Sequence, residues 1–344
     1  MTNPSKRLPL STRIAAATAL VACGPAVAQA LGGPPPASLV KAAQAEGQIM
    51  IYSSEDEHTQ RATLAAFEKK YGIKGGFIRF PTGPLMQRFN TEHDGGKVQA
   101  DVVSVSSPIP YETQTDRFAQ LNPQLVPAIA NWPKDAVKPT YVNFTMDIVA
   151  LVYNTEQVKP GEVPQTWADL ANPKWKGKFL LTNPTVADNY MGWLDAVERK
   201  HGSELLRKIA TQDYKLTQSG ASGVQMVAAG AYLFNAPTFT AFSRALIEKK
   251  APIAIQYLKD PTVISARSLG IAAKAPHPNA ARLYVHWLLS EEGVRSYCGY
   301  IKTSVFGDPS GQRGCVGFRD GEVMRFDVPE ERRRAMAKAL GVGN

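Results

Sequence analysis

The sequence has few of the residues from which a catalytic centre is usually built. It contains five histidines, which are far apart along the chain: His58, His93, His201, His277 and His286. Ser104 and Ser106 do not lie in a Gly-x-Ser-x-Gly turn, and no phosphate-binding P-loop or Gly-x-Gly-x-x-Gly run follows a predicted strand. We therefore expect no catalytic residues, no enzyme activity and no cofactor.

The basic residues do not form the dense blocks with interleaved aromatics that are typical of nucleic-acid-binding proteins. The formal net charge is +9, and the triplet Arg332–Arg334 lies in a predicted C-terminal helix, where we expect a solvated face. A mild positive field helps to gather anionic solutes. We expect no nucleic-acid partner.

Cysteine is also scarce, with Cys23, Cys298 and Cys315 as the three examples. Cys23 lies in the N-terminal leader, so the other two form an isolated pair in the rest of the chain. In an oxidising compartment such a pair predicts one disulfide bond. A metal site would need more nearby ligands than these two, and we predict none.

The first thirty residues resemble a secretory signal peptide. Lys6, Arg7 and Arg13 form a basic start, residues 14–22 form a short apolar run, and small residues at 28–30 offer a cleavage site. The apolar run is too short to span a membrane. The leader predicts a periplasmic protein. An alternative is a lipoprotein tethered through Cys23, because residues 20–23 also fit the lipid-attachment pattern.

The next part of the chain predicts an α/β sheet. The apolar residues 49–52 form a buried-strand pattern, and residues 59–71 form an amphipathic helix. Strand patterns recur at 75–80 and 100–107, the former followed by a helical pattern with Pro84 in its first turn. With 44% hydrophobic and 20% charged residues, the chain can form two domains with buried cores.

Hydroxyl side chains follow three successive predicted strands. Ser53 and Ser54 end the first strand, Thr82 follows the second, and Ser106 and Ser107 end the third. Each one alone also fits a helix cap or a turn residue. In an open α/β sheet, ligands lie at the carboxyl ends of the strands, where helix N-termini favour anions. Together these residues predict a crevice suited to an oxyanion.

The second half of the chain offers a similar set of polar side chains. A long apolar strand is predicted at 145–154, and we expect it to cross between domains. Helices are predicted at 163–170, 190–201, 224–229 and 239–249, a short strand at 231–235, and a core-facing apolar helix at 280–290. Thr185, Asn189, Ser222 and Asn235 stand at predicted element ends and complete the predicted ligand site, although each also fits a simple turn.

Several stretches in this half resemble one protein family. Val-Tyr-Asn-Thr at 152–155, Pro-Gln-Thr-Trp-Ala-Asp-Leu at 164–170 and Asn-Pro-Lys-Trp-Lys-Gly-Lys at 172–178 resemble the bacterial extracellular solute-binding proteins, the periplasmic receptors of ABC importers. Residues 51–54, 100–102 and 275–293 match further parts of the pattern in the family's order. The branch that the sequence most resembles contains ferric-iron and phosphonate receptors.

The resemblance implies a type 2 periplasmic-binding fold with two α/β lobes, two hinge strands and a ligand cleft between the lobes. After the signal peptide at 1–30, we expect lobe 1 at 31–135 and 259–344 and lobe 2 at 136–258. The hinge strands are expected near 145–153 and 231–235. A receptor of this kind closes on its solute, as a monomer, and delivers it to a membrane permease with its ATPase.

The cargo remains a choice between two chemistries. Ferric-binding members of the family place adjacent tyrosines at a second-lobe strand end and often a histidine after the first strand. The stretch that corresponds here is Asn235–Thr238, without a tyrosine pair, and Asp56 takes the place of the histidine. Glu55, Glu57, His58 and Tyr232 lie nearby. We therefore predict a small organic anion, such as a phosphonate, a phosphate ester or a carboxylate. The alternatives are ferric iron and, further off, a secreted enzyme or sensory adaptor on the same fold.

Overall fold

The computed structural model describes Met1 and residues 30–55, 57–300, 304–318 and 321–343. The predicted signal peptide, the lipid-attachment pattern at Cys23 and the position of Asp56 lie outside the described residues. Among the helices that are described, none has the length and apolar composition needed to cross a membrane.

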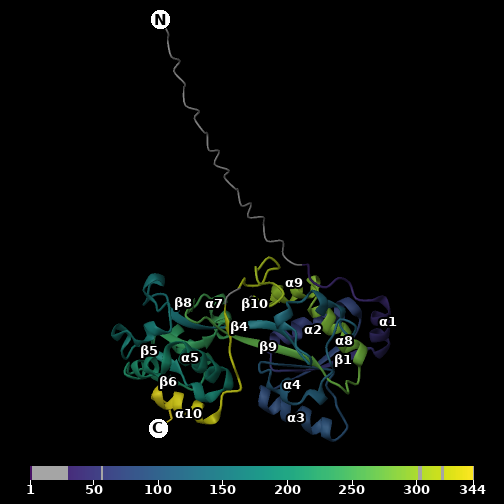
Figure 1. Ribbon diagram of the computed structural model, residues 1–344, viewed down its shortest axis with the longest axis horizontal. Coiled ribbons are helices and arrows are strands. Elements are labelled where there is room, and N and C mark those ends of the chain that lie inside the picture. The colour runs from purple at the N-terminus through teal and green to yellow at the C-terminus, as the bar shows by residue number, and fades with distance from the viewer. Residues whose placement is uncertain (2–29, 56, 301–303, 319–320, 344) are drawn as a thin grey trace.

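The first half of the chain forms the parallel sheet that its strand patterns predict. Strand β1 (Gln48–Ser53) lies between β2 (Lys74–Arg79) and β3 (Val102–Val105), parallel to both. Helices α2 (Glu57–Tyr71) and α3 (Thr82–Asp94) each follow one of these strands. Figure 1 shows these elements in the right half of the molecule. Strand β1 buries apolar side chains in this lobe because helices cover its sheet.

Two long antiparallel strands join this sheet to a second one. Strand β4 (Val142–Asn154) pairs with β9 (Val263–Ile271) along its first half, and β9 pairs in turn with β3. The second half of β4 pairs with β7 (Phe234–Phe239) and β8 (Ile253–Tyr257). Both strands run through the middle of the molecule (Figure 1), so the predicted passage of residues 145–154 between the two halves is confirmed.

The second sheet departs from prediction at two places. The expected strand at 231–235 begins only at Phe234, whose ring packs against Trp175 and Phe179, and it continues to Phe239. This segment is an interior strand of the sheet and not a hinge, so the second predicted hinge is wrong. The chain returns through β9 instead.

The helix predicted at 239–249 is replaced by a 3-10 turn, Thr240–Phe242, and the short helix α7 (Arg244–Glu248). In place of the helix predicted at 163–170, the structure has only a 3-10 turn, Ala168–Ala171. Strand β5 (Phe179–Thr182) and strand β6 (Lys215–Thr217) complete the second sheet, next to helices α5 (Asp188–Ala210) and α6 (Gly220–Ala228).

The other helices and strands are short or lie at the edges of the two sheets. They are α1 (Ala37–Glu46), α4 (Ile109–Thr113), α8 (Pro278–Leu288), α9 (Glu291–Tyr300), α10 (Glu330–Ala339), β10 (Ser304–Val305) and β11 (Glu322–Val323). Single 3-10 turns lie at Thr115–Arg117, Pro127–Asn131, Lys134–Ala136, Pro160–Glu162, Pro173–Trp175 and Pro184–Val186.

Each sheet has its own hydrophobic core. In the first core Phe67 of α2 packs edge-on against Tyr284 and close to Trp287 of α8, which confirms the apolar stripe predicted for 280–290. In the second core Trp167 contacts Trp193 of α5 with ring centroids 5.1 Å apart. Further, smaller clusters lie around Tyr52 and Val103 in the first lobe and around Val152 and Leu180 in the second. Separate cores in the two lobes are what a two-lobed α/β protein requires.

The C-terminal helix α10 packs on the second core, at the lower left of Figure 1. Its Met336 is buried there, and Arg332 forms ion pairs with Asp195 and Glu198 of α5. The expected solvated face is confirmed for Arg334, whereas Arg332 and Arg333 are partly buried and form ion pairs with α5. The expected lobe boundaries stay a prediction, but the end of the range 259–344, which was assigned to lobe 1, lies against the other core.

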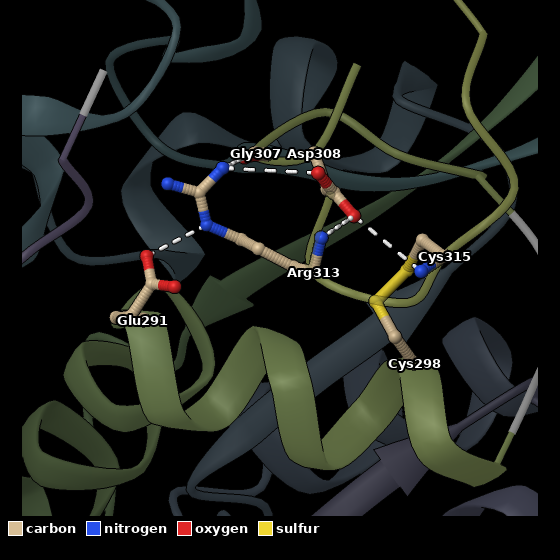
Figure 2. The surroundings of a disulfide bond; sticks show 6 residues. All are labelled: Glu291, Cys298, Gly307, Asp308, Arg313 and Cys315. Carbon is tan, nitrogen blue, oxygen red and sulfur yellow. Dashed lines mark hydrogen bonds and ion pairs between the residues drawn. A yellow bond between two sulfur atoms is a disulfide. The ribbon is translucent and has the colours of Figure 1, made fainter. Parts of the chain in front are cut away.

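A disulfide bond between Cys298 and Cys315 confirms the predicted pairing and ties the end of α9 to the loop that follows. Figure 2 shows Asp308 beside this bond, where its carboxylate accepts hydrogen bonds from the backbone N–H groups of Arg313 at 2.8 Å and Cys315 at 3.4 Å. The Arg313 guanidinium donates in turn to Glu291 at 2.7 Å. These contacts fix the loop to the first lobe.

Candidate functional site

A cavity of about 680 Å³ lies between the two lobes, in the range typical of small-molecule sites. Its lining comes from the ends of β1 and β3, the start of α3, the middle of β4 and β9, and the second-lobe segments 187–189 and 239–244. The cavity therefore lies at the place expected for the ligand of a two-lobed receptor.

The wall from the first sheet contains four of the predicted ligand-binding residues. Ser54, Thr82, Ser106 and Ser107 all line the cavity. The hydroxyls of Thr82 and Ser106 lie 3.4 Å apart, and Ser54 Oγ accepts a hydrogen bond of 2.8 Å from Arg267 Nη1. These side chains lie close together because they follow the carboxyl ends of neighbouring parallel strands. Their contact with a ligand stays a prediction.

From the second lobe, Asn189 also lines the cavity, where α5 begins. The remaining four predicted residues do not. Ser53 is fully buried and its hydroxyl accepts from the backbone N–H of Glu55. Thr185 is exposed and bonds to Asn183, while Ser222 is exposed and donates to the carbonyl of Ser219.

Asn235 was expected at a strand end, and this expectation is wrong. It lies inside β7, fully buried, and its side-chain oxygen accepts a hydrogen bond of 3.3 Å from Thr182. Because the strand starts at Phe234 and not at Ala231, the side chain of Asn235 is directed into the packed interior of the second lobe.

The floor of the cavity is formed by four polar side chains of β4 and β9 that were not predicted as site residues. Thr145 and Asp147 of β4 and Ser265 and Arg267 of β9 all line it. In the antiparallel register Thr145 lies opposite Arg267, and Asp147 lies opposite Ser265. Alternate residues of a strand share a face, so these four side chains point to the same side. The two strands that connect the lobes thus also carry charged groups into the cleft.

Arg267 lies at the centre of a hydrogen-bonded group that joins three elements. Its Nε lies 3.0 Å from Glu55 Oε2, and the hydroxyl of Tyr297 in α9 donates to the same oxygen at 3.0 Å. Burial, with the nearby Glu55 charge, raises the pKa of Tyr297 well above its usual range. The phenol is therefore a neutral donor, and the guanidinium is the permanent cation of the floor.

Asp147 is the acid of the floor and keeps a small exposed surface toward the cleft. Burial raises its pKa to about 6, against the opposing effects of a 2.9 Å hydrogen bond from Thr240 and the positive charge of Arg267. Its carboxylate is thus a poorly solvated anion, which one more hydrogen-bond donor would stabilise.

Two more arginines face the cavity. Arg79 at the end of β2 donates to the backbone carbonyl of Glu55 at 3.3 Å, and Arg244 opens α7 in the second lobe. The first residues of α3, Thr82 and Gly83, also line the cavity, so the unpaired N–H groups of a helix N-terminus lie near it. The cleft thus offers several groups that attract negative charge, although its three arginines are matched by three acids in the same lining.

The cleft also contains oxygen donors for a hard metal ion. The cleft offers the carboxylates of Glu55, Asp147 and Asp188, and Tyr297 is the tyrosine that lines it. Within the described ranges, the one cluster of histidine, cysteine or acidic side chains with metal-ligand spacing is Cys298, Asp308 and Cys315. That cluster lies at the disulfide bond, where the sulfurs are bonded to each other.

The fold and the cleft define a two-lobed binding protein with an open site between its lobes. The chain belongs to the family described as bacterial extracellular solute-binding protein, which matches residues 62–304. It is thus a solute-binding protein of the kind that serves ABC importers, as the family resemblance of its sequence implied. Members of this family are binding proteins and not enzymes.

Two known proteins are similar to the chain over most of its length. An Fe(3+)-binding periplasmic protein of Serratia marcescens is 23% identical over 274 residues, which cover 74% of this chain and 77% of that protein. An uncharacterised protein of Haemophilus influenzae is 24% identical over 292 residues, 81% of this chain and 80% of the relative.

Solved structures share the fold at low identity. The substrate-binding protein of an ABC transporter from Agrobacterium tumefaciens superposes with a TM-score of 0.72 at 16% identity, covering 85% of this chain and 94% of that chain. The periplasmic binding protein AfuA of Actinobacillus pleuropneumoniae, solved with fructose-6-phosphate, gives 0.66 at 19% identity and covers 86% and 99%. Iron-bound HitA of Pseudomonas aeruginosa gives 0.65 at 18%, covering 86% and 97%.

Proposed function

We propose that this protein binds a small anionic solute, such as a phosphate ester, a phosphonate or a carboxylate, between its lobes and delivers it to a membrane permease. The observation that carries the proposal is the position of Arg267, whose guanidinium lies on the cavity floor beside Ser54 and Glu55. Arginine presents a planar fork of donors that matches carboxylate and phosphate oxygens.

The walls support the same chemistry. Thr82 and Ser106 add neutral hydroxyl donors opposite the floor, and Arg244 adds a second cation from the other lobe. A solute held by Arg267 on one side and Arg244 on the other would stabilise the closed arrangement of the lobes more than the open one. Differential binding of this kind shifts the balance toward closure. We propose β4 and β9 as the hinges.

Ferric iron is the second candidate, and the names of the relatives favour it over an organic anion. Besides the Serratia protein, an iron uptake protein A1 of Synechocystis is 27% identical over 165 residues. A structural neighbour from Trichodesmium was solved with iron and citrate ligands. In this cleft the carboxylates of Glu55, Asp147 and Asp188 and the phenol of Tyr297 are the available oxygen ligands. An iron ion that arrives with a carboxylate would place that carboxylate on Arg267.

Isothermal titration calorimetry decides between the two candidates. The purified protein is stripped of metal and titrated with a phosphate ester, a phosphonate, citrate and ferric citrate. The proposal expects binding of at least one free anion without iron, a loss of about a hundredfold in Arg267→Gln, and no change in Arg61→Gln, an exposed arginine of α2. Binding that requires iron and gives a coloured complex would overturn the anion and establish the second candidate.

The cellular location follows from the family. Extracellular solute-binding proteins act outside the inner membrane, so we propose that the chain is exported to the periplasm. Its Cys298–Cys315 disulfide fits an oxidising compartment. Fractionation of cells that carry the full chain, with a Cys23→Ser variant beside it, separates a soluble from a lipid-anchored form.

A further inference from the structure

The floor of the cleft carries a cation and an acid side by side, and the anion proposed above uses only the cation. Arg267 and Asp147 lie on neighbouring strands and belong to successive residue pairs on the same face of the sheet, Thr145–Arg267 and Asp147–Ser265. Successive pairs on one face of a sheet are separated by about 7 Å. A solute that places its anionic group on Arg267 therefore extends toward Asp147 if it is larger than an inorganic oxyanion.

The groups around Asp147 determine which kind of ligand group can bind there. They come from every element that packs on this point: Thr240, Ser265, Arg267, Arg244, Glu55, Tyr190 and Tyr257. Arg267, which Glu55 shares, and Arg244 both face Asp147 and repel a further cation there. An anion there would face the carboxylate itself. A neutral hydrogen-bond donor meets neither repulsion and satisfies an acid that has lost much of its hydration.

We propose that Asp147 is a specificity-determining residue and that the solute is an organic anion bearing hydroxyl groups, with its anionic group on Arg267 and a hydroxyl donating to Asp147. This inference rests on the anionic solute proposed above. It excludes bare inorganic phosphate and simple alkyl acids as preferred cargo, because they bring the carboxylate no further donor besides Thr240.

The volume and lining of the cavity agree with an organic solute that reaches both Arg267 and Asp147. Its volume of about 680 Å³ is far larger than an inorganic ion requires. Met86 and Ile109 line one side and Phe239 and Phe242 the other, so apolar surface is available for a carbon skeleton between the polar groups.

Matched ligand pairs test the inference on the unaltered protein. Calorimetry compares glycerol 3-phosphate with propyl phosphate, and gluconate with hexanoate, so that the members of each pair share the anionic group and differ in hydroxyls. We expect the hydroxylated member of at least one pair to bind at least tenfold more tightly, as one hydrogen bond to a charged group provides.

The variant Asp147→Asn then locates the effect. It should reduce the preference within the pair by at least tenfold and leave the affinity for the member without hydroxyls unchanged or improved. Asp116→Asn, an exposed acid of the first lobe, is the matched control and should keep the preference. The comparison on the unaltered protein stays decisive even if Asp147→Asn does not fold.

The outcomes separate the two proposals. Equal binding of both members, lost in Arg267→Gln, would overturn the role of Asp147 and keep the anionic solute. A preference that survives in folded Asp147→Asn would also overturn that role. If no anion binds, and only iron does, the proposed function fails and this inference fails with it.

Discussion

Arg267 Nε lies 3.0 Å from Glu55 Oε2, so the cation on the cavity floor is paired with an acid of the first lobe. The same carboxylate oxygen accepts a hydrogen bond from Tyr297. An anionic solute must share Arg267 with Glu55, and Glu55 repels it. Glu55 would thus limit the affinity for the proposed anionic solute, whereas it would be a ligand for a ferric ion.

This pairing predicts opposite effects of one substitution for the two cargoes. In Glu55→Gln the amide oxygen can still accept from Tyr297, but the negative charge beside Arg267 is lost. We expect affinity for an anionic solute to rise by about tenfold, equivalent to roughly 1.4 kcal/mol. Calorimetry measures it, with the exposed Glu57→Gln as control. A loss of affinity for the anionic solute would contradict this prediction, and a loss of iron binding would favour ferric iron as the solute.

Asp147 predicts an unusual pH dependence of stability. Burial raises its pKa from 3.8 to about 6, so between these values the folded protein binds a proton that the unfolded chain has released. The contribution of this group to stability is therefore fully favourable below pH 4 and declines as pH rises through 6. We expect Asp147→Asn to raise the free energy of unfolding at pH 8 by about 2 kcal/mol and to change it little at pH 4. Urea denaturation at both pH values checks this, and an equal effect at both would contradict it.

The positions of the cleft hydroxyls could be predicted because parallel strands end at one edge of a sheet. Ser54, Thr82 and Ser107 followed three strands in order, and all three line the cavity. Asn235 could not be placed this way, since the start of β7 depends on the packing of Phe234 against Phe179.

The charged floor was missed for a different reason. Asp147 and Arg267 are single charges within long apolar strands. A lone charge in such a strand was the available sign in the sequence that these residues belong to a polar site. What brings them together is the antiparallel register of β4 with β9, more than a hundred residues later in the chain. Periodicity along one strand carries no information on its partner or register.

Close packing at the start of α6 predicts that Gly220 does not tolerate an added methyl group. A Cβ at Gly220 would lie 2.2 Å from the hydroxyl of Tyr190 and 3.0 Å from Thr238 Oγ1, both in the buried second lobe. We expect Gly220→Ala to lower the free energy of unfolding by about 2 kcal/mol through overpacking. Gly83→Ala in α3, where a Cβ meets nothing within 4 Å, is the control and should not destabilise. Denaturant titrations compare the two, and equal stability would contradict the close packing.

The disulfide predicts a link between the redox state of the protein and its cleft. Cys298 follows Tyr297 in α9, and the bond to Cys315 closes a segment with a sequence separation of 17. Loops of this size are stabilised by about 3 kcal/mol. We expect a phosphine reductant to lower the melting temperature and to weaken anion binding, because Tyr297 is held less firmly against Glu55. The double variant Cys298→Ser, Cys315→Ser should show both effects without reductant and no further change with it. Unchanged anion affinity in the double variant would show that α9 keeps Tyr297 in place without the bond.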